Sequence, residues 1–229
     1  MTNFKIISKE EYLKHNKKPD QLRVWNAIAK PWKTYVVKKI TIIEEFLKNK
    51  NGKVIDLGCG TGRNMIPNPN IEYYGVDFSE GHLNQAKDYI QKNKVNARLY
   101  KLQAYDLSKF HDNYFDYGLF ISTLHCLETE NQRLNALKEF YRVLKTSAMA
   151  FISVWNSRDK RFKHVDYHGD IYMSWLENNI PYMRSYYLYN KEELIELIKS
   201  VRFKILHFYE FDDYDRFSKK NWIIKVERC

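Results

Sequence analysis

Cysteine is scarce in this sequence, which holds only Cys59, Cys126 and Cys229 among its 229 residues. Three scattered thiols are too few for a disulfide framework and lack the paired spacing of a zinc site, so we predict neither, and no metal site. Free thiols fit a reducing cell interior. Long hydrophobic runs are also missing, and no stretch approaches the roughly 20 apolar residues of a membrane span. The N-terminus lacks the apolar core of a signal peptide, so we expect a soluble, cytoplasmic protein without a membrane partner.

Acidic residues are outnumbered, because 28 of them face 38 lysines and arginines. The resulting net charge of +10 and pI near 9.3 favour contact with a polyanion such as nucleic acid. A solvated basic surface without such a partner would give the same balance. Internal repeats and low-complexity tracts are absent as well. The length then predicts a single domain over residues 1–229 with a full hydrophobic core.

A glycine-rich turn follows an apolar, strand-like run. Residues 54–57 are Val-Ile-Asp-Leu, and Gly58, Gly60 and Gly62 follow at one-residue intervals. This order predicts a buried parallel strand, a tight turn and the start of a helix. Glycine lets the backbone of such a turn approach a ligand and adopt positive φ. A dinucleotide fingerprint would need a further glycine where this chain has Arg63, which argues against NAD.

An acidic residue ends the next predicted strand, Tyr-Tyr-Gly-Val-Asp at residues 73–77. A carboxylate at the tip of the second strand of an open α/β sheet is placed to accept hydrogen bonds from ribose hydroxyls. The glycine turn and Asp77 together therefore indicate a ligand that carries a ribose.

These two motifs, at residues 56–62 and 74–79, closely resemble those of the class I S-adenosylmethionine (SAM) methyltransferases. In that family the glycine turn approaches the amino-acid and ribose portions of SAM, and the acid after the second strand binds the ribose hydroxyls. An acid near the tip of the third strand often holds the adenine amino group; here Gln103 stands at that position, with Asp106 as the alternative. The resemblance implies SAM as the cofactor, bound by Asp56, Gly58, Cys59, Gly60, Gly62, Asn64, Asp77, Phe78, Gln103, Ala104, Asp106 and Ser122.

The strand pattern fits the fold that this resemblance implies. Strands are expected near residues 54–57, 73–77, 97–102, 115–121, 149–155, 203–211 and 222–226. We therefore expect an α/β protein with a seven-stranded Rossmann-like sheet, helices on both faces and a C-terminal antiparallel hairpin. Residues 1–50 are predicted to form N-terminal helices, one of which Pro31 should end or kink.

The segment after the fourth strand carries the candidate catalytic residue. Ligands of open α/β sheets bind outside the carboxyl ends of the strands, so Ser122 and His125 should face the transferred methyl group. By analogy, amine methylation would be marked by Asn or Asp followed by two prolines, whereas residues 121–125 are Ile-Ser-Thr-Leu-His. His125 then acts as a base or orienter, or the acceptor needs no base, as a carboxylate does not. A third alternative is that His125 only helps to wall the pocket.

Residues 156–189 interrupt the α/β rhythm with cations interleaved among tyrosines. That composition suits phosphate contact and base stacking, on the substrate side of the sheet. The alternative is an irregular surface insertion whose tyrosines pack on the sheet edge. On the first interpretation, the substrate-binding candidates are Lys30, Trp32, Trp155, Asn156, Arg158, Lys160, Arg161, Arg184 and Tyr187.

The wobble-uridine tRNA methyltransferases are similar to this chain in further pieces, at residues 24–32, 63–64, 124–125, 152–156 and 184–189. Members of that family esterify a 5-carboxymethyluridine at the first anticodon position and work with a small zinc-binding activator subunit. The resemblance implies the anticodon region of tRNA as the substrate and a heterodimer with such an activator. A methyltransferase of small molecules and a non-enzymatic SAM-fold scaffold are the alternatives.

Overall fold

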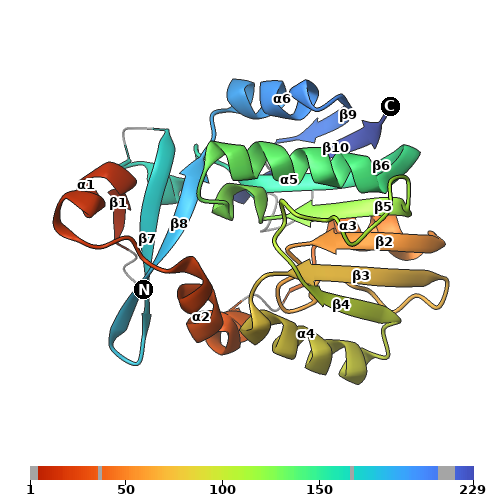
Figure 1. Cartoon of the computed structure of the whole chain (residues 1–229), viewed down its shortest axis with the longest axis horizontal. Helices are drawn as coiled ribbons and strands as arrows, with labels where there is room; N and C mark the ends of the chain where they lie inside the picture. The colour runs from red at the N-terminus through yellow and green to blue at the C-terminus, as the bar shows by residue number, and fades with distance from the viewer. Residues whose placement is uncertain (1–4, 36–37, 166–167, 211–219) are drawn as a thin grey trace.

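The computed structural model describes residues 5–35, 38–165, 168–210 and 220–229. Within these residues, seven strands form a large sheet at the centre of the molecule, in the order β4-β3-β2-β5-β6-β10-β9 (Figure 1). The strands are β2 (Gly52–Leu57), β3 (Ile71–Asp77), β4 (Ala97–Lys101), β5 (Phe115–Ile121), β6 (Leu144–Trp155), β9 (Phe203–Tyr209) and β10 (Asn221–Arg228). The predicted seven-stranded α/β sheet is confirmed.

The directions of the strands determine where a ligand can bind. Strands β4, β3, β2, β5 and β6 pair in parallel, whereas β10 is antiparallel to both β6 and β9. The predicted C-terminal antiparallel hairpin is therefore confirmed. The chain proceeds from β2 outward to β3 on one side and later to β5 on the other, so a crevice opens at the carboxyl ends of β2 and β5.

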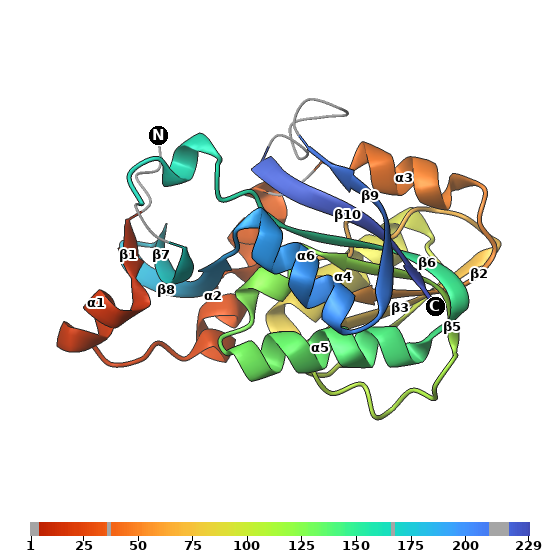
Figure 2. The ribbon, with the colours of Figure 1, turned by 90° about the horizontal axis from the view of Figure 1, so that it is seen from above.

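Helices cover both faces of the large sheet because successive strand residues point to opposite faces. On one face Ile55 packs in a cluster with Leu137 of α5 (Glu130–Val143) and with α6 (Lys191–Ser200). On the other face Val54 packs with Leu47 of α3 (Thr41–Lys48) and next to α4 (Glu80–Asn93). Figure 2 shows α3 and α5 on opposite sides of the sheet.

A small antiparallel sheet stands at one end of the large one and contains most of the segment predicted as an insertion. Its order is β1-β7-β8, with β1 (Ile6–Ser8), β7 (Gly169–Glu177) and β8 (Ile180–Leu188). Asn178 and Asn179 join β7 to β8 and both have positive φ, which suits a two-residue hairpin turn. The segment is therefore largely a regular hairpin. Its buried side chains pack against α2 (Gln21–Tyr35) in an aromatic cluster that includes Trp25, Trp175 and Tyr186.

The N-terminal region contains a strand that was not predicted, and its second helix continues past Pro31. Besides α1 (Lys9–His15), α2 and α3, it contains a strand, β1, which pairs with β7. Pro31 does not end α2, which continues to Tyr35. A proline removes one backbone hydrogen bond, and burial of Trp25 and Ile28 on the same helix offsets that loss. Among the described residues, no helix is long and apolar enough to cross a bilayer. The predicted end of the sixth strand at Phe211 lies outside those residues.

Candidate active site

The turn after β2 is shaped by three glycines with positive φ: Gly58 at +74°, Gly60 at +54° and Gly62 at +81°. A Cβ atom on Gly58 would lie 2.1 Å from Oγ1 of Thr123, so only glycine lets this turn pack against the segment after β5. A Cβ on Gly60 would meet nothing closer than a ring carbon of His82 at 3.9 Å. Gly60 therefore leaves open space beside the backbone.

Asp77 ends β3 with a carboxylate held in place by the backbone. The N–H of Gly60 donates to its Oδ2 at 2.9 Å, and the N–H of Ser79 donates to its Oδ1 at 2.9 Å. Each carboxylate oxygen can accept more than one hydrogen bond, so both can still receive hydroxyls of a ligand. Ser79 also caps α4 and donates to Asn26 of α2 at 2.8 Å, which ties α2 to this corner of the site.

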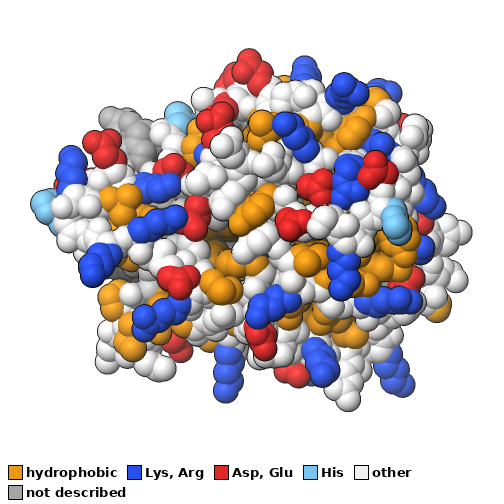
Figure 3. Space-filling model, in the orientation of Figure 1, with side chains coloured by type: hydrophobic (Ala, Val, Ile, Leu, Met, Phe, Trp, Pro, Cys, Tyr) orange, Lys and Arg blue, Asp and Glu red, His pale blue; other side chains and the backbone are white. Residues whose placement is uncertain are grey.

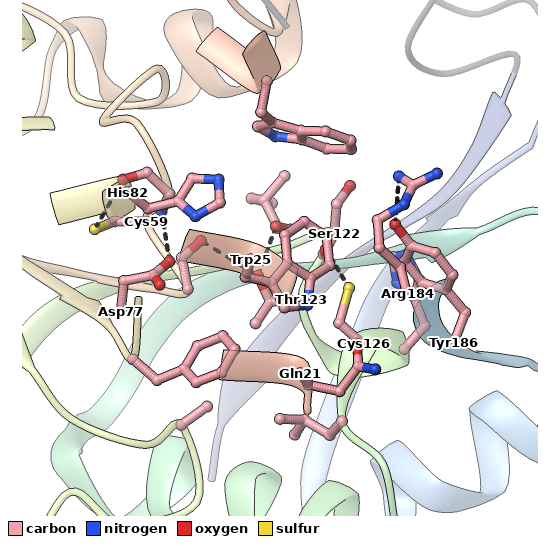
Figure 4. Close-up of a pocket in the computed structure, with 18 of the residues that line it drawn as sticks. Gln21, Trp25, Cys59, Asp77, His82, Ser122, Thr123, Cys126, Arg184 and Tyr186 are labelled. Atoms are coloured by element: carbon pink, nitrogen blue, oxygen red, sulfur yellow. Dashed lines mark hydrogen bonds between the residues drawn. The ribbon is translucent and has the colours of Figure 1, made fainter. Parts of the chain in front are cut away.

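These elements border one cavity of about 1180 Å³ (Figure 4). Pockets for single ligands usually measure roughly 300–1,000 Å³, so this one has room for a cofactor and an acceptor together. In Figure 4, Asp77 lies at one side of the cavity, Arg184 and Tyr186 lie at the other, and Ser122 and Thr123 lie between them. We call the first side the glycine half; its lining includes Gly58, Cys59, Gly60, Asn64, Asp77, Phe78, Gln103 and Ala104. We call the second side the aromatic half; its lining includes Trp25, Trp32, His125, Cys126, Trp155, Arg161, Trp175, Arg184 and Tyr186.

The aromatic half is built from rings that different elements bring together. Trp32 of α2 packs 5.5 Å from Trp175 of β7, and Trp155 of β6 lies 4.0 Å from Tyr186 of β8, measured between ring centroids. Offset and edge contacts at these separations are favourable and hold the rings rigidly. Arg184 is 2% exposed among them, and its Nη1 donates to the Tyr186 hydroxyl at 2.8 Å.

His125 lies in a 3₁₀ helix, η1 (Leu124–Cys126), and is 1% exposed. Its ring lies 4.9 Å from Trp155 and stacks on Tyr186 at 5.6 Å. Burial, and then the positive charge of Arg161, lower the pKa of His125 to about 3. The imidazole is therefore neutral at physiological pH and a weak base, because an effective base has a pKa near the working pH.

The segment between β5 and η1 is fixed in an unusual conformation. Ser122 has φ +52°, and its N–H donates to both the carbonyl and the hydroxyl of Ser153 at 3.0 Å. The hydroxyl of Thr123 donates to the Gly58 carbonyl at 3.3 Å. The buried Ser122 hydroxyl has no hydrogen-bond partner among the described residues. Non-glycine residues with positive φ cluster at ligand sites, and here the conformation presents Ser122 between the two halves.

Asp56 is fully buried at the end of β2, directly before the glycine turn. Burial raises the pKa of its carboxyl to about 7, helped by the charge of Asp77 and opposed by Arg63 and Asn64. Both of its oxygens lie without a hydrogen bond of normal length from any described residue. Burial thus favours the protonated form of Asp56 well above the usual pKa of a carboxyl.

Comparison with known proteins decides the family. Residues 54–147 match a family model described as a methyltransferase domain. A protein of Encephalitozoon cuniculi that bears the name of a methyltransferase is 31% identical over 159 residues, which cover 67% of this chain and 70% of that protein. The chain belongs to the class I SAM-dependent methyltransferases. The tRNA (carboxymethyluridine(34)-5-O)-methyltransferase of Schizosaccharomyces pombe is 29% identical to this methyltransferase over 227 residues, 87% of this chain and 95% of that one. The resemblance to the wobble-uridine group is therefore confirmed.

Solved structures support the fold of this methyltransferase. A SAM-dependent methyltransferase from Methanosarcina mazei has a TM-score of 0.66 at 20% identity, over 84% of this chain and 99% of that one. A 1,6-didemethyltoxoflavin-N1-methyltransferase from Burkholderia thailandensis, with bound S-adenosylhomocysteine, has a TM-score of 0.70 at 14% identity, over 100% and 96%. At these identities the likeness concerns the architecture.

The glycine half of the methyltransferase fits SAM. Gly60 leaves a space that any Cβ would fill, and Asp77 presents a fixed carboxylate to a ribose diol. Nine of the predicted cofactor-binding residues border the cavity: Gly58, Cys59, Gly60, Asn64, Asp77, Phe78, Gln103, Ala104 and Ser122. Asp56 and Gly62 do not border it, and the exposed Asp106 instead accepts from the Ser108 N–H at 3.2 Å. Of the two candidates for the adenine amino group, Gln103 borders the cavity and Asp106 does not.

The predicted substrate residues divide into two groups. Trp32, Trp155, Arg161 and Arg184 border the cavity together with His125. The others lie elsewhere: Lys30, Arg158 and Lys160 are exposed, Asn156 is buried and accepts from the Arg158 N–H, and Tyr187 stacks under Arg133. The roles of both groups in substrate binding stay predictions.

Several lining residues of the methyltransferase were missed from the sequence. Trp25 was not among the predicted substrate residues, although it stands seven residues before Trp32 and therefore lies on the same face of α2. Tyr186 stands two residues after Arg184 and so shares its face of β8. Trp175 carries no such signal, because only the pairing of β7 with β8 brings it to the cavity.

Proposed function

We propose that this methyltransferase esterifies the carboxylate of a 5-carboxymethyl-modified wobble uridine in tRNA. SAM supplies a methyl group on a sulfonium, so a C–O bond forms as the C–S bond breaks and the electron pair remains on the sulfur of S-adenosylhomocysteine. The carboxylate oxygen is already ionised, and no proton moves in this step. The acceptor named for the Schizosaccharomyces pombe relative is consistent with this chemistry.

The observation that carries the proposal is the arrangement of the aromatic half, where His125 is buried against Trp155 and Tyr186 and two arginines border the cavity. Burial also lowers the pKa of His125, to about 3. An amine or hydroxyl acceptor must lose a proton and needs a base whose pKa lies near the working pH. A carboxylate has a pKa of roughly 4 and needs none. Arg161 and Arg184 provide positive charge that favours binding of such an anion. The site therefore suits a carboxylate better than a protonated nucleophile.

Other titratable groups on the cavity wall are poor alternatives as bases. His82 is buried, which lowers its pKa, and its Nδ1 lies 3.1 Å from the Ser79 hydroxyl. Glu128 pairs with Lys18 at 2.9 Å near the cavity rim. Asp77 is engaged by two backbone N–H groups in the glycine half. These contacts support an acceptor that arrives already deprotonated.

The residues of the chain would then act mainly by orientation. The glycine turn and Asp77 would hold the cofactor. Trp155 is partly exposed and would offer a flat surface to a uracil ring, while Tyr186 and His125 pack against Trp155 and support it. Holding two reactants in line supplies much of the rate enhancement of such a displacement. His125 would serve here as part of the cavity wall, packed against Trp155 and Tyr186.

Cations at the rim support contact with tRNA phosphates. Lys18, Lys38, Lys39, Arg63 and Lys220 border the cavity, whereas the acids on its lining are Asp20, Asp77 and Glu128. Figure 3 shows lysines and arginines spread over one face of the molecule among scattered acids. Binding would therefore depend on many individual phosphate contacts and weaken as salt rises.

The proposal includes a small zinc-binding activator subunit and a cytoplasmic location. Strand β4 is an edge of the large sheet, and its residues Leu99 and Tyr100 are partly exposed. An edge strand offers free backbone groups to which a partner can add a strand. Residues 102–105 follow β4 directly and border the cavity, so a partner at this edge would also stabilise the cofactor site.

Transfer of labelled methyl groups tests the proposal. The protein, co-expressed with its activator, should label tRNA that carries unesterified 5-carboxymethyluridine and leave tRNA with an unmodified wobble uridine unlabelled. Labelling should fall steeply as salt rises, as expected for a polyanionic substrate. The proposal is wrong if neither tRNA is labelled, or if the unmodified tRNA is labelled equally well.

A further inference from the structure

Arg184 is a buried cation held rigidly in the wall of the aromatic half. Besides the Tyr186 hydroxyl, its guanidinium donates from Nη2 to the Ser174 carbonyl at 3.3 Å. Its Cζ lies 5.4 Å from the ring of Trp32 and 5.3 Å from those of Trp175 and Tyr186. Guanidinium groups favour such aromatic surroundings and keep a planar fork of N–H donors. These contacts set the orientation of the fork before any acceptor enters.

The charge of Arg184 reaches the neighbouring side chains of the cavity. It opposes the rise in pKa that burial causes at the Cys126 thiol and at the Tyr186 hydroxyl. Arg161 also borders this half, but its Nε contacts Asp159 Oδ1 at 2.6 Å and its Nη2 donates to the Lys220 carbonyl. The charge of Arg161 is therefore shared with a carboxylate, whereas the contacts given above join Arg184 to a hydroxyl, a carbonyl and aromatic rings. Arg184 is for this reason the better candidate for contact with an acceptor.

We propose that Arg184 forms a carboxylate subsite, in which its guanidinium binds the acceptor carboxylate and directs one oxygen toward the glycine half. Figure 4 shows Arg184 and Asp77 on opposite sides of the cavity, with Ser122 between them, which is the order that acceptor, methyl group and ribose would follow. The inference rests on the proposed function for the identity of the acceptor. The subsite itself selects a flat ring that carries a carboxylate.

This subsite has a consequence for selectivity and for product release. A carbamoylmethyl group has the same shape as a carboxymethyl group but is neutral, and its NH₂ would oppose the N–H donors of Arg184. A site built around a charged hydrogen bond rejects an analogue that lacks the partner. The methyl ester also lacks the charge, so the product binds more weakly than the substrate and leaves.

Binding of two anticodon stem–loop RNAs tests the inference, one with carboxymethyluridine and one with carbamoylmethyluridine at the wobble position. Fluorescence anisotropy would measure both dissociation constants for the protein–activator complex saturated with S-adenosylhomocysteine. We expect the carboxymethyl RNA to bind about 10–100-fold tighter, the usual range for hydrogen bonds to a charged group. Arg184→Gln should bring the ratio of the two constants close to one and leave S-adenosylhomocysteine affinity unchanged. A ratio near one for the unsubstituted protein, or an unchanged ratio in folded Arg184→Gln, would overturn the inference.

Two further variants separate this role from a structural one. Arg133 is likewise buried, stacks on Tyr187 at 3.9 Å and lies outside the cavity lining, so Arg133→Gln should leave the ratio unchanged. If Arg184→Gln does not fold, Tyr186→Phe serves instead; it keeps the ring and removes the hydroxyl that orients the guanidinium. We expect Tyr186→Phe to lower the ratio about 3–10-fold, the effect of one hydrogen bond. An unchanged ratio in this variant would count against the subsite.

The binding measurement tests the carboxylate subsite, and the methyl-transfer measurement tests the proposed function. Preference for the carboxymethyl RNA without any methyl transfer to it would support the anion subsite and contradict the proposed reaction. Methyl transfer to the carboxymethyl RNA without a preference in binding would support the proposed reaction and contradict the carboxylate subsite.

Discussion

The two halves of the cavity differ in whether backbone or side chains form them. The glycine half consists mostly of backbone: a turn with positive φ angles, and a carboxylate that two N–H groups hold. The aromatic half consists of side chains from α2, β6, β7 and β8, held by ring contacts and burial. A backbone cradle suits a cofactor that is the same in every reaction, whereas side chains can change to suit the acceptor. Perturbing each half should therefore damage a different function.

The largest effect should follow Gly58→Ala. Its Cβ would lie 2.1 Å from Thr123 Oγ1 at a φ of +74°, so overpacking and backbone strain together should cost roughly 2–5 kcal/mol of unfolding free energy. Gly60→Ala is the matched control, because its Cβ meets open space. We expect Gly60→Ala to lose only about 1–2 kcal/mol but to block SAM binding. Urea unfolding measures the loss of stability, and calorimetry measures SAM binding. Equal destabilisation by the two variants would contradict the different roles assigned to Gly58 and Gly60.

Asp56→Asn should change how stability depends on pH. The folded protein keeps a proton on Asp56 up to a pKa of about 7, whereas the unfolded chain releases it near 4. The unfolding free energy of the wild type should therefore fall as pH rises from 4 to 7, by on the order of 4 kcal/mol from this residue.

The titration of His125 changes the unfolding free energy in the opposite direction. Between pH 3 and 6.5 the unfolded chain binds the His125 proton more tightly than the folded protein, so stability rises with pH. That contribution is common to both proteins, so the difference between wild type and Asp56→Asn isolates Asp56. Urea unfolding at pH 5 and pH 8 measures it. A difference that is constant over this interval would show that Asp56 titrates normally.

Asp77→Ala should weaken the glycine half alone. The ribose loses a charged acceptor, which is worth about 1.5–3 kcal/mol, or roughly 10–150-fold in the dissociation constant of SAM. Asp88→Ala on the exposed side of α4 is a matched control. The preference for carboxymethyl over carbamoylmethyl RNA should not change. An unchanged SAM dissociation constant would remove Asp77 from the site.

His125→Phe tests whether the aromatic half contains a base. The substitution keeps a ring beside Trp155 and Tyr186 and removes both nitrogens. Loss of a general base usually costs 10²–10⁴-fold in rate, whereas we expect a change within about tenfold. The pH profile of kcat/KM should show no ascending limb near 6.5 in either protein. A limb that disappears in His125→Phe would identify His125 as the base.

The smallest effect should come from the cavity rim. Lys38 is exposed and borders the cavity, so Lys38→Ala should lower the salt slope of tRNA binding by about one. Lys199→Ala, on the exposed side of α6, should leave the slope unchanged. If the two variants behave alike, the rim has no particular role in contact with tRNA.

The sequence was sufficient for the glycine half because its parts are local. Three glycines and the acid at the end of the next strand specify the turn within about twenty residues, and the parallel sheet brings the strand ends together. The aromatic half needs contacts that no short pattern contains. Trp175 reaches the cavity only through the register of β7 on β8, and composition alone could not separate the buried Arg184 from the exposed Lys160.

Contacts distant in sequence also shape two local features. Of the two outcomes expected at Pro31, an end of the helix is excluded, because α2 packs against the small sheet and continues to Tyr35. Residues 156–189 were recognised as a departure from the α/β rhythm, although not as a hairpin that pairs with a strand near the N-terminus. The packing of α2 on the small sheet and the pairing of β1 with β7 join segments more than a hundred residues apart, whereas the β7–β8 hairpin itself is local.

The central claim is that the acceptor atom is a carboxylate oxygen. The most direct measurement is mass spectrometry of nucleosides from tRNA methylated by the protein–activator complex, before and after mild alkali. The account predicts that carboxymethyluridine gains one methyl group, and that alkali removes it because it is an ester. A methyl group that survives alkali, on a ring nitrogen or on the ribose, would contradict the account.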